Sequence, residues 1–215
     1  MITDAIILAA GASTRLGRPK QLLPFRGQTL LGRAIVAVSA APVRRVLVVL
    51  GAHAALIRAH ANADGVDFVE NVDWRHGMGS SIGAGMRALP AQPPPDAVLL
   101  AVCDQPLLTS EHVAALVEAH RQHPGSLVAS RYDDDVVGVP ALFPRALFAE
   151  LRAMAPHSGA KAIIQRHRDM TVLLPFPEGA FDIDTPDDYE QLSPGGSSQN
   201  RTENLTRMRA PSTEN

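Results

Sequence analysis

Short apolar runs that do not alternate with polar residues constrain the fold of this chain most. The clearest cover residues 6–8 (IIL), 45–50 (RVLVVL) and 97–102 (AVLLAV). Strands of this kind are buried on both faces, as in a sheet with helices on either side. Apolar residues at helical spacing separate them, over residues 29–39, 53–62 and 109–122. Because strands that alternate with helices pair in parallel with right-handed crossovers, the sequence predicts an α/β fold with a mostly parallel central sheet.

Further strands are expected to complete the sheet at residues 67–70, 127–130, 136–143 and 171–174. Gly138 and Pro140 fall within the third of these segments. Because proline cannot donate a hydrogen bond to a neighbouring strand, we expect this segment to be irregular or to lie at an edge of the sheet.

Composition limits the class of protein. Hydrophobic residues make up 46% of the 215-residue chain, enough for one α/β domain, which we expect over residues 1–192. Residues 193–215 carry few large apolar side chains and are expected to form a disordered tail. The net charge of −2 argues against a nucleic-acid partner. A single cysteine, no membrane-length apolar run, and a first strand that leaves no room for a signal peptide favour the cytoplasm and no membrane partner.

The loop after the first strand carries the first chemical signal. Small and polar residues lead into three cations, Arg15, Arg18 and Lys20. A glycine-containing turn at this place lets backbone N–H groups approach a polyanion, and the cations suit a triphosphate. An ordinary loop with surface charges fits the same spacing. The loop is not a P-loop, because Gly17 lies six positions after Gly11 and is not followed by Lys-Ser.

A second glycine-rich segment covers residues 71–89. Its glycines at 77, 79, 83 and 85 invite a dinucleotide-binding interpretation, and hence an oxidoreductase. Ile82 stands where the GxGxxG fingerprint needs its third glycine, so a hydride-transfer enzyme is the weaker alternative. Trp74, the single tryptophan, is interpreted as a packing residue.

Acidic residues supply the second signal. Asp104 follows the strand at 97–102, at the edge where open α/β sheets bind ligands, although such a residue is more often a turn or cap residue. Asp182 and Asp184 alternate with apolar neighbours, so both are predicted to project from one face of a strand, where they need a cation or water. Cys103 is expected to be a buried apolar residue that points away from Asp104.

Residues 8–31 carry a family resemblance. They read LAAGASTRLGRPKQLLPFRGQTLL and resemble the opening signature of the MobA-like NTP transferase family, specifically its molybdenum cofactor cytidylyltransferase branch. The family pattern L-A-A/G-G-x-S-x-R-x-G-x-x-K is matched at Leu8, Ala9, Gly11, Ser13, Arg15, Gly17 and Lys20. The resemblance continues to about Leu192. It implies the Rossmann-like three-layer sandwich of the nucleotide-diphospho-sugar transferase superfamily.

The resemblance also implies a set of site residues. Nucleotide-binding residues would be Leu8, Ala9, Ala10, Gly11, Ala12, Ser13, Arg15, Lys20 and Asp104, with a helix N-terminus at Gly79, Ser80 and Ser81 beside the base and ribose. The two serines are equally good N-cap residues. Arg15, Lys20 and Asp104 would be catalytic. Asp104 and Asp182 would coordinate Mg²⁺, with Mn²⁺ as an alternative, and Asp184 would support them.

The implied reaction moves CMP from CTP to the terminal phosphate of molybdenum-loaded molybdopterin and releases pyrophosphate. Its product, the cytosine dinucleotide cofactor, would pass to a molybdenum hydroxylase. In the resembling family Ala-Ala-Gly accompanies CTP and Ala-Gly-Gly accompanies GTP, so Ala9-Ala10-Gly11 favours CTP. Residues 156–160 (PHSGA) depart from the family's G-D-x-G-A, which leaves the acceptor open. The alternatives are a nucleotidyltransferase that uses another NTP or a sugar or polyol phosphate, an NAD(P)-dependent oxidoreductase, and a non-catalytic cofactor chaperone.

Overall fold

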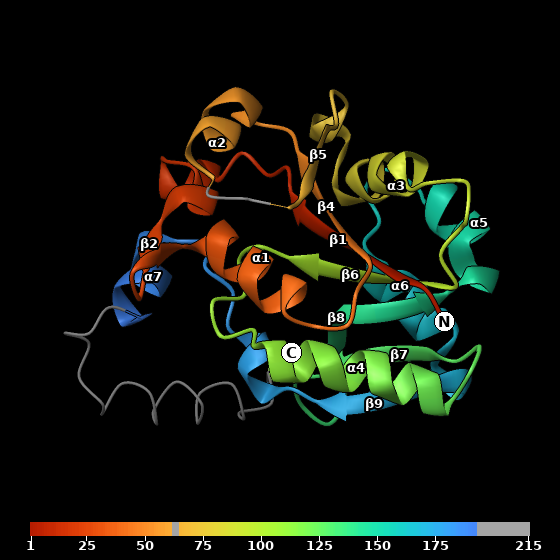
Figure 1. The fold of residues 1–215 in the computed structure, drawn as a ribbon. Coiled ribbons are helices and arrows are strands. Elements are labelled where there is room, and N and C mark those ends of the chain that lie inside the picture. The colour runs from red at the N-terminus through yellow and green to blue at the C-terminus, as the bar shows by residue number, and fades with distance from the viewer. Residues whose placement is uncertain (62–64, 193–215) are drawn as a thin grey trace, which may run out of the picture.

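The computed structural model describes residues 1–61 and 65–192, and the expected tail at 193–215 lies outside the described residues. A seven-stranded sheet crosses the molecule in the order β5-β4-β1-β6-β8-β7-β9 (Figure 1). Its strands are β1 (Thr3–Ala9), β4 (Arg45–Leu50), β5 (Asp67–Glu70), β6 (Ala97–Val102), β7 (Leu127–Arg131), β8 (Val137–Pro144) and β9 (Thr171–Pro175). A two-stranded sheet pairs β2 (Pro24–Phe25) with β3 (Gln28–Thr29).

The central sheet is mostly parallel, as predicted. β1 lies between β4 and β6 and runs parallel to both, with Ile6 opposite Leu47 on one side and Leu100 on the other. The pairs β4–β5 and β7–β9 are also parallel. β8 is the exception, because it pairs antiparallel with β6 and with β7.

β8 corrects one prediction. It lies between two strands, so the expectation of an edge strand is wrong, whereas the expected irregularity is present. Ala129 of β7 pairs with Ala141, and the next residue, Ser130, pairs with Gly138. This register shift leaves Pro140 without a ladder partner on β7, so its missing N–H costs no hydrogen bond there.

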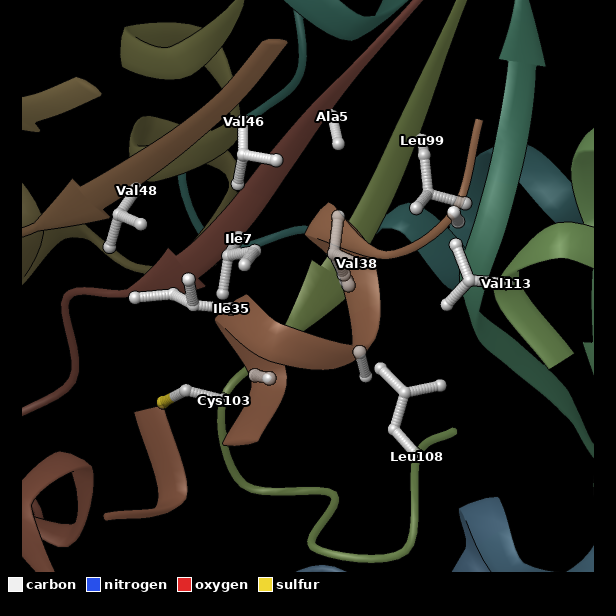
Figure 2. Close-up of a cluster of buried hydrophobic side chains, with 14 of the residues drawn as sticks. Ala5, Ile7, Ile35, Val38, Val46, Val48, Leu99, Cys103, Leu108 and Val113 are labelled. Carbon is white, nitrogen blue, oxygen red and sulfur yellow. The ribbon is translucent and has the colours of Figure 1, made fainter. Parts of the chain in front are cut away.

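Helices cover both faces of the sheet and make the predicted three-layer sandwich. α1 (Leu30–Ser39), α2 (Ala54–His60) and α4 (Ser110–Gln122) pack on one face. The opposite face is covered by α3 (Met78–Ala88), α5 (Phe148–Arg152) and α6 (Ala160–Arg166). Figure 2 shows the first of these cores, where odd-numbered β1 residues such as Ala5 and Ile7 meet Ile35 and Val38 of α1. None of the described helices is long and apolar enough to cross a membrane.

Two helices begin where the sequence predicts. The Thr29 hydroxyl accepts the N–H of Gly32 at 3.0 Å, and the Thr109 hydroxyl accepts that of His112 at 3.3 Å. Each threonine satisfies one of the N–H groups that the first helical turn leaves without a backbone partner.

A third hydrophobic cluster joins the two ends of the described chain. It contains Leu16, Leu23, Phe25, Leu30, Ile183 and Leu192. The last of these belongs to α7 (Pro186–Leu192), which lies beside β2 (Figure 1). The cluster therefore fixes the segment around Ile183 next to the loop that follows β1.

Candidate functional site

A pocket of about 340 Å³ opens at the carboxyl ends of β1 and β6. This is the edge at which open α/β sheets bind ligands, and the volume suits a small molecule. Of the predicted nucleotide-binding residues, those that line it are Leu8, Ala9, Ala10, Gly11, Ala12, Lys20, Ser81 and Asp104.

Lys20 forms the centre of a charged network at this pocket. Its ammonium donates to Asp104 Oδ2 at 2.6 Å and to Asp184 Oδ1 at 2.7 Å, and also to the Ile183 carbonyl at 3.3 Å. Arg15 donates to the other Asp184 oxygen at 2.6 Å. The structure thus brings the predicted Arg15 and Lys20, from the loop after β1, together with Asp104 and Asp184, which lie far away in the sequence.

The network fixes the charge state of its members. Burial alone would lower the pKa of Lys20, but the charge of Asp104 and the hydrogen bonds from both carboxylates raise it above its ordinary value. For Asp184, partial burial would raise the pKa, and the Lys20 hydrogen bond and charge together with Arg15 lower it instead. Lys20 is therefore a permanent cation, and Asp184 a carboxylate, at neutral pH.

The carboxylates retain negative charge that the cations do not neutralise. Asp104 Oδ1 is buried and accepts no hydrogen bond from any described residue. Asp182 is exposed, yet the surrounding protein and the charge of Asp104 raise its pKa to about 7. A buried carboxylate oxygen with no donor, beside a second carboxylate, fits a hard divalent cation such as Mg²⁺ or Mn²⁺. Within the described residues no three or more His, Cys, Asp or Glu side chains are grouped to hold a metal ion.

The segment that carries Asp182 and Asp184 is not a strand, which corrects the prediction. It connects the short 3-10 helix Pro177–Ala180 to α7, and Ile183 donates its N–H to the Asp104 carbonyl at 3.2 Å. The alternation of Ile183 with the acids reflects the burial of this side chain in the third cluster. It is Asp184, which sequence reasoning placed second, that contacts Lys20 and Arg15 directly.

The start of α3 also differs from the prediction. The helix begins at Met78, with Gly77 as its N-cap at a φ of 115°, so neither serine is the cap. Gly79 donates its N–H to the Pro156 carbonyl at 2.9 Å, and the Ser80 hydroxyl donates to the Gly77 carbonyl at 2.7 Å. Among the three predicted residues, only Ser81 lines the pocket.

Ser13 shapes the loop without lining the pocket. It adopts the left-handed conformation, with a φ of 54°, and its hydroxyl accepts the Lys20 N–H at 3.0 Å. Because Ser13 holds the main chain of Lys20, it contributes to placing the ammonium between the two carboxylates.

Trp74 and Arg75 also line the pocket, although neither of them was assigned to a binding site from the sequence. Trp74 packs against Gly51, where an added Cβ would lie 2.6 Å from the tryptophan Cβ, in agreement with the packing interpretation, and it also lines the pocket. The Arg75 guanidinium lies 4.5 Å from the centroid of the indole ring. The signal available in the sequence was an aromatic residue followed by an arginine within the glycine-rich segment 71–89.

Cys103 is the buried apolar residue that the sequence predicts. It is 3% exposed and packs in the first core (Figure 2). Burial, reinforced by the neighbouring Asp104, raises the pKa of its thiol to about 12. A thiol that stays protonated at neutral pH is unsuited to nucleophilic catalysis.

The sheet, its two helical layers and a charged pocket at the strand ends together define a Rossmann-like nucleotidyltransferase fold. The chain belongs to the MobA-like NTP transferase domain family, whose model matches residues 5–171.

Individual proteins are also similar to this chain over part of their length. Nicotine blue oxidoreductase from Paenarthrobacter nicotinovorans is 41% identical over 128 residues, which cover 59% of this chain and 60% of that protein. The bifunctional protein GlmU from Gloeobacter violaceus is 35% identical over 134 residues, 60% of this chain and 29% of GlmU. The chain therefore matches less than two thirds of the length of either protein.

Among solved structures, Rv0371c from Mycobacterium tuberculosis H37Rv superposes with a TM-score of 0.74 and 31% identity, covering 89% of this chain and 96% of Rv0371c. A structure of Rv0371C in complex with manganese gives a TM-score of 0.72 and 28% identity, over 89% of this chain and 98% of that one.

Proposed function

We propose that this protein is a metal-dependent nucleotidyltransferase that moves CMP from CTP to the terminal phosphate of molybdenum-loaded molybdopterin. The observation that carries the proposal is the meeting of Lys20, Asp104 and Asp184 at the pocket lined by the loop after β1. Membership of the NTP transferase family supports a nucleoside triphosphate as substrate. The Ala9-Ala10-Gly11 sequence supports CTP, and a molybdenum hydroxylase would receive the product.

The triphosphate would bind by exchanging partners with the carboxylates. Lys20 and Arg15 are paired with Asp104 and Asp184 in the free protein. A polyphosphate offers the same cations more negative charge, and it also offers acceptors to the loop N–H groups. The raised pKa of Lys20 means that this cation needs no proton uptake before it contacts phosphate.

Asp104 and Asp182 would hold the divalent ion, Mg²⁺ or Mn²⁺. The unpaired Asp104 Oδ1 supports this assignment, as does the manganese complex of the related Rv0371C. The ion would neutralise phosphate charge during the transfer. Because the described residues provide no larger group of ligands, nucleotide oxygens would complete its coordination.

The transfer requires no general base from the protein. A phosphate monoester has a second pKa near ~6, so the acceptor phosphate is already an anion at neutral pH. One of its oxygens forms a bond to the α-phosphorus of CTP, the bond from that phosphorus to the α–β bridging oxygen breaks, and pyrophosphate leaves. Lys20 and Arg15 would stabilise the charge that develops on pyrophosphate.

One assay tests the proposal: pyrophosphate release from CTP, with and without molybdenum-loaded molybdopterin. Release that requires both substrates supports it. Release from GTP in preference to CTP would contradict the base assignment, and release driven by a sugar or polyol phosphate would favour that alternative acceptor. Binding of CTP and pterin with no pyrophosphate release would indicate a cofactor carrier.

A second candidate function is an oxidoreductase, which the 41% identity to nicotine blue oxidoreductase favours. Against it, the segment 77–85 lacks the third glycine of the dinucleotide fingerprint, and Gly79 packs against the 155–158 backbone. Titration with NADPH, followed by nucleotide fluorescence, separates the two functions. Saturable NADPH binding without CTP turnover would favour the oxidoreductase.

A further inference from the structure

A glutamine lies buried beneath the loop that follows β1. Gln21, in the 3-10 helix Lys20–Leu22, is 0% exposed. Its Nε2 donates to the Ala9 carbonyl at 2.8 Å and to the Gly11 carbonyl at 2.9 Å. The carbonyl between them, that of Ala10, accepts the N–H of Ala52 at 3.0 Å. Three consecutive loop carbonyls are therefore held by donors of the protein itself.

The positions of these carbonyls determine where the loop N–H groups point. A trans peptide is planar, so its C=O and the N–H of the next residue point in opposite directions. With the Ala10 and Gly11 carbonyls held, the N–H groups of Gly11 and Ala12 face the other way. Neither N–H donates a hydrogen bond to any residue in the described part of the chain, and both residues line the pocket. Successive free N–H groups in a turn form a binding site for anions.

The carboxamide oxygen of Gln21 shows which of its hydrogen bonds stabilise the protein. Its Oε1 is buried and has no hydrogen-bond partner among the described residues. A buried, unpaired acceptor is destabilising. The stabilising contribution of the Gln21 carboxamide therefore comes from its two Nε2 hydrogen bonds to the loop carbonyls. The adjacent Lys20 ties its N–H to Ser13, so neighbouring residues hold both halves of the loop.

We propose that Gln21 is a positioning residue, whose carboxamide orients the loop so that the Gly11 and Ala12 N–H groups bind the polyphosphate of the nucleotide. This inference rests on the proposed function, because it assumes that the pocket takes a nucleoside triphosphate. Gln21 is assigned this role because its carboxamide donates to two loop carbonyls. Its loss should therefore weaken binding according to the number of phosphates, rather than weaken every ligand equally.

The test compares Gln21→Met, which has a similar length but no donor, with the wild-type protein. Fluorescence of Trp74, the single tryptophan and a pocket residue, reports the Kd for CTP with Mg²⁺ and for CMP. We expect at least about a tenfold loss for CTP, as for weakened hydrogen bonds to a charged group, and a smaller loss for CMP. Ser130→Ala is the matched control, because it removes a buried hydroxyl that donates to the Pro140 carbonyl and does not line the pocket.

Equal CTP affinity in Gln21→Met and the wild type would overturn the inference, as would equal losses for CTP and CMP. A comparable loss of CTP affinity in Ser130→Ala would also overturn it, because the effect would then follow from stability alone. If the wild type binds no nucleotide, the proposed function is wrong, and the inference about Gln21, which rests on it, is wrong as well.

A measurement on the wild type covers the case in which Gln21→Met does not fold. Titration with inorganic pyrophosphate should shift the backbone amide resonances of Gly11 and Ala12 in an NMR spectrum. Saturating pyrophosphate that leaves both resonances in place would overturn the inference.

Discussion

Among single residues, Lys20 makes the most consequential contacts, because one ammonium pairs with two carboxylates in the free protein. In a nucleotide complex, the same cation would stabilise the leaving pyrophosphate. Lys20→Met keeps most of the side chain's length but removes both functions. We expect pyrophosphate release to fall about 10²–10³-fold, the usual effect of losing one preorganised charge in an active site.

Lys161→Met in α6 serves as the matched control for Lys20→Met, since Lys161 is exposed and lies outside the pocket. Steady-state rates of both variants, with thermal melting to verify folding, complete the comparison. Turnover of Lys20→Met within a factor of about three of wild type would remove Lys20 from the reaction.

His112 gives a prediction on pH. Its ring stacks on Phe176 at a centroid distance of 4.2 Å, and its Nε2 pairs with the Ser130 hydroxyl at 2.8 Å. Burial lowers the pKa of His112, and the charge of Glu178 opposes this effect only in part. As the pH falls through ~6.5, the unfolded chain therefore takes up a proton before the folded protein does. Stability at this site is complete above that pH and is lost below it.

The measurement is the urea midpoint of wild type and of His112→Phe at pH 7.5 and 5.5. His112→Phe keeps a ring on Phe176 and should reduce the loss of stability at pH 5.5 by at most about 1.4 kcal/mol per pH unit. A difference between proteins is needed, because the raised pKa of Asp182 makes an opposite contribution in the same range. His123→Gln, at an exposed position, is the control. Identical pH dependence in wild type and His112→Phe would refute the assignment.

For whole elements, the start of α3 depends on close packing against the loop at 155–158. A Cβ added at Gly79 would lie 2.2 Å from the Ala155 carbonyl oxygen, which no side-chain rotation relieves. We expect Gly79→Ala to destabilise the protein by about 1–3 kcal/mol. At Gly83, in the same helix, the nearest atom to an added Cβ is the Arg87 Nη1 at 3.1 Å, the end of a flexible side chain.

Gly83→Ala is therefore the control for Gly79→Ala, and it should be neutral or slightly stabilising because alanine is the better helix former. Chemical unfolding of the two variants distinguishes them. Equal stability of both would show that the backbone contact at Gly79 relaxes without cost.

The elements also show what the sequence could predict. Residues 45–50 and 97–102 form strands with the predicted bounds, because a short apolar run without alternation has no better place than the centre of a sheet. The position of β8 between β6 and β7 could not be read from Gly138 and Pro140, because the register shift that accommodates the proline depends on β7. At residues 181–184 a strand-like alternation arose instead from one buried residue, Ile183.

The site was predictable to the extent that it follows the strand ends. Asp104 could be placed because it lies just after the end of a central strand. The contacts of Gln21 could not be predicted, because hydrogen bonds from one side chain to nearby carbonyls leave no periodic pattern in a sequence. The direct contact of Asp184 with Lys20 also depends on how the last described segment packs, which spacing alone does not determine.

Across the whole molecule, the third hydrophobic cluster makes the site depend on both ends of the described chain. Ile183 is fully buried there, the next residue, Asp184, pairs with Lys20, and the charge of Asp104 acts on Asp182 on its other side. Ile183→Ala should destabilise the protein by about 2–5 kcal/mol, as for other buried isoleucines. Unlike an ordinary core substitution, it should also loosen the two carboxylates.

Binding of Mn²⁺ in the presence of CTP, measured by electron paramagnetic resonance on folded protein, separates these effects. Ile163→Ala in α6 is the control. It removes a similarly buried isoleucine from the core between the sheet and helices α3, α5 and α6, away from the pocket. We expect both variants to lose stability but only Ile183→Ala to bind Mn²⁺ more weakly. The reason is that the strand end and the first loop fix Asp104, whereas Asp182 and Asp184 lie on a segment without regular structure that Ile183 anchors. Unchanged Mn²⁺ affinity in Ile183→Ala would mean that Asp104 and the nucleotide hold the ion without Asp182 and Asp184.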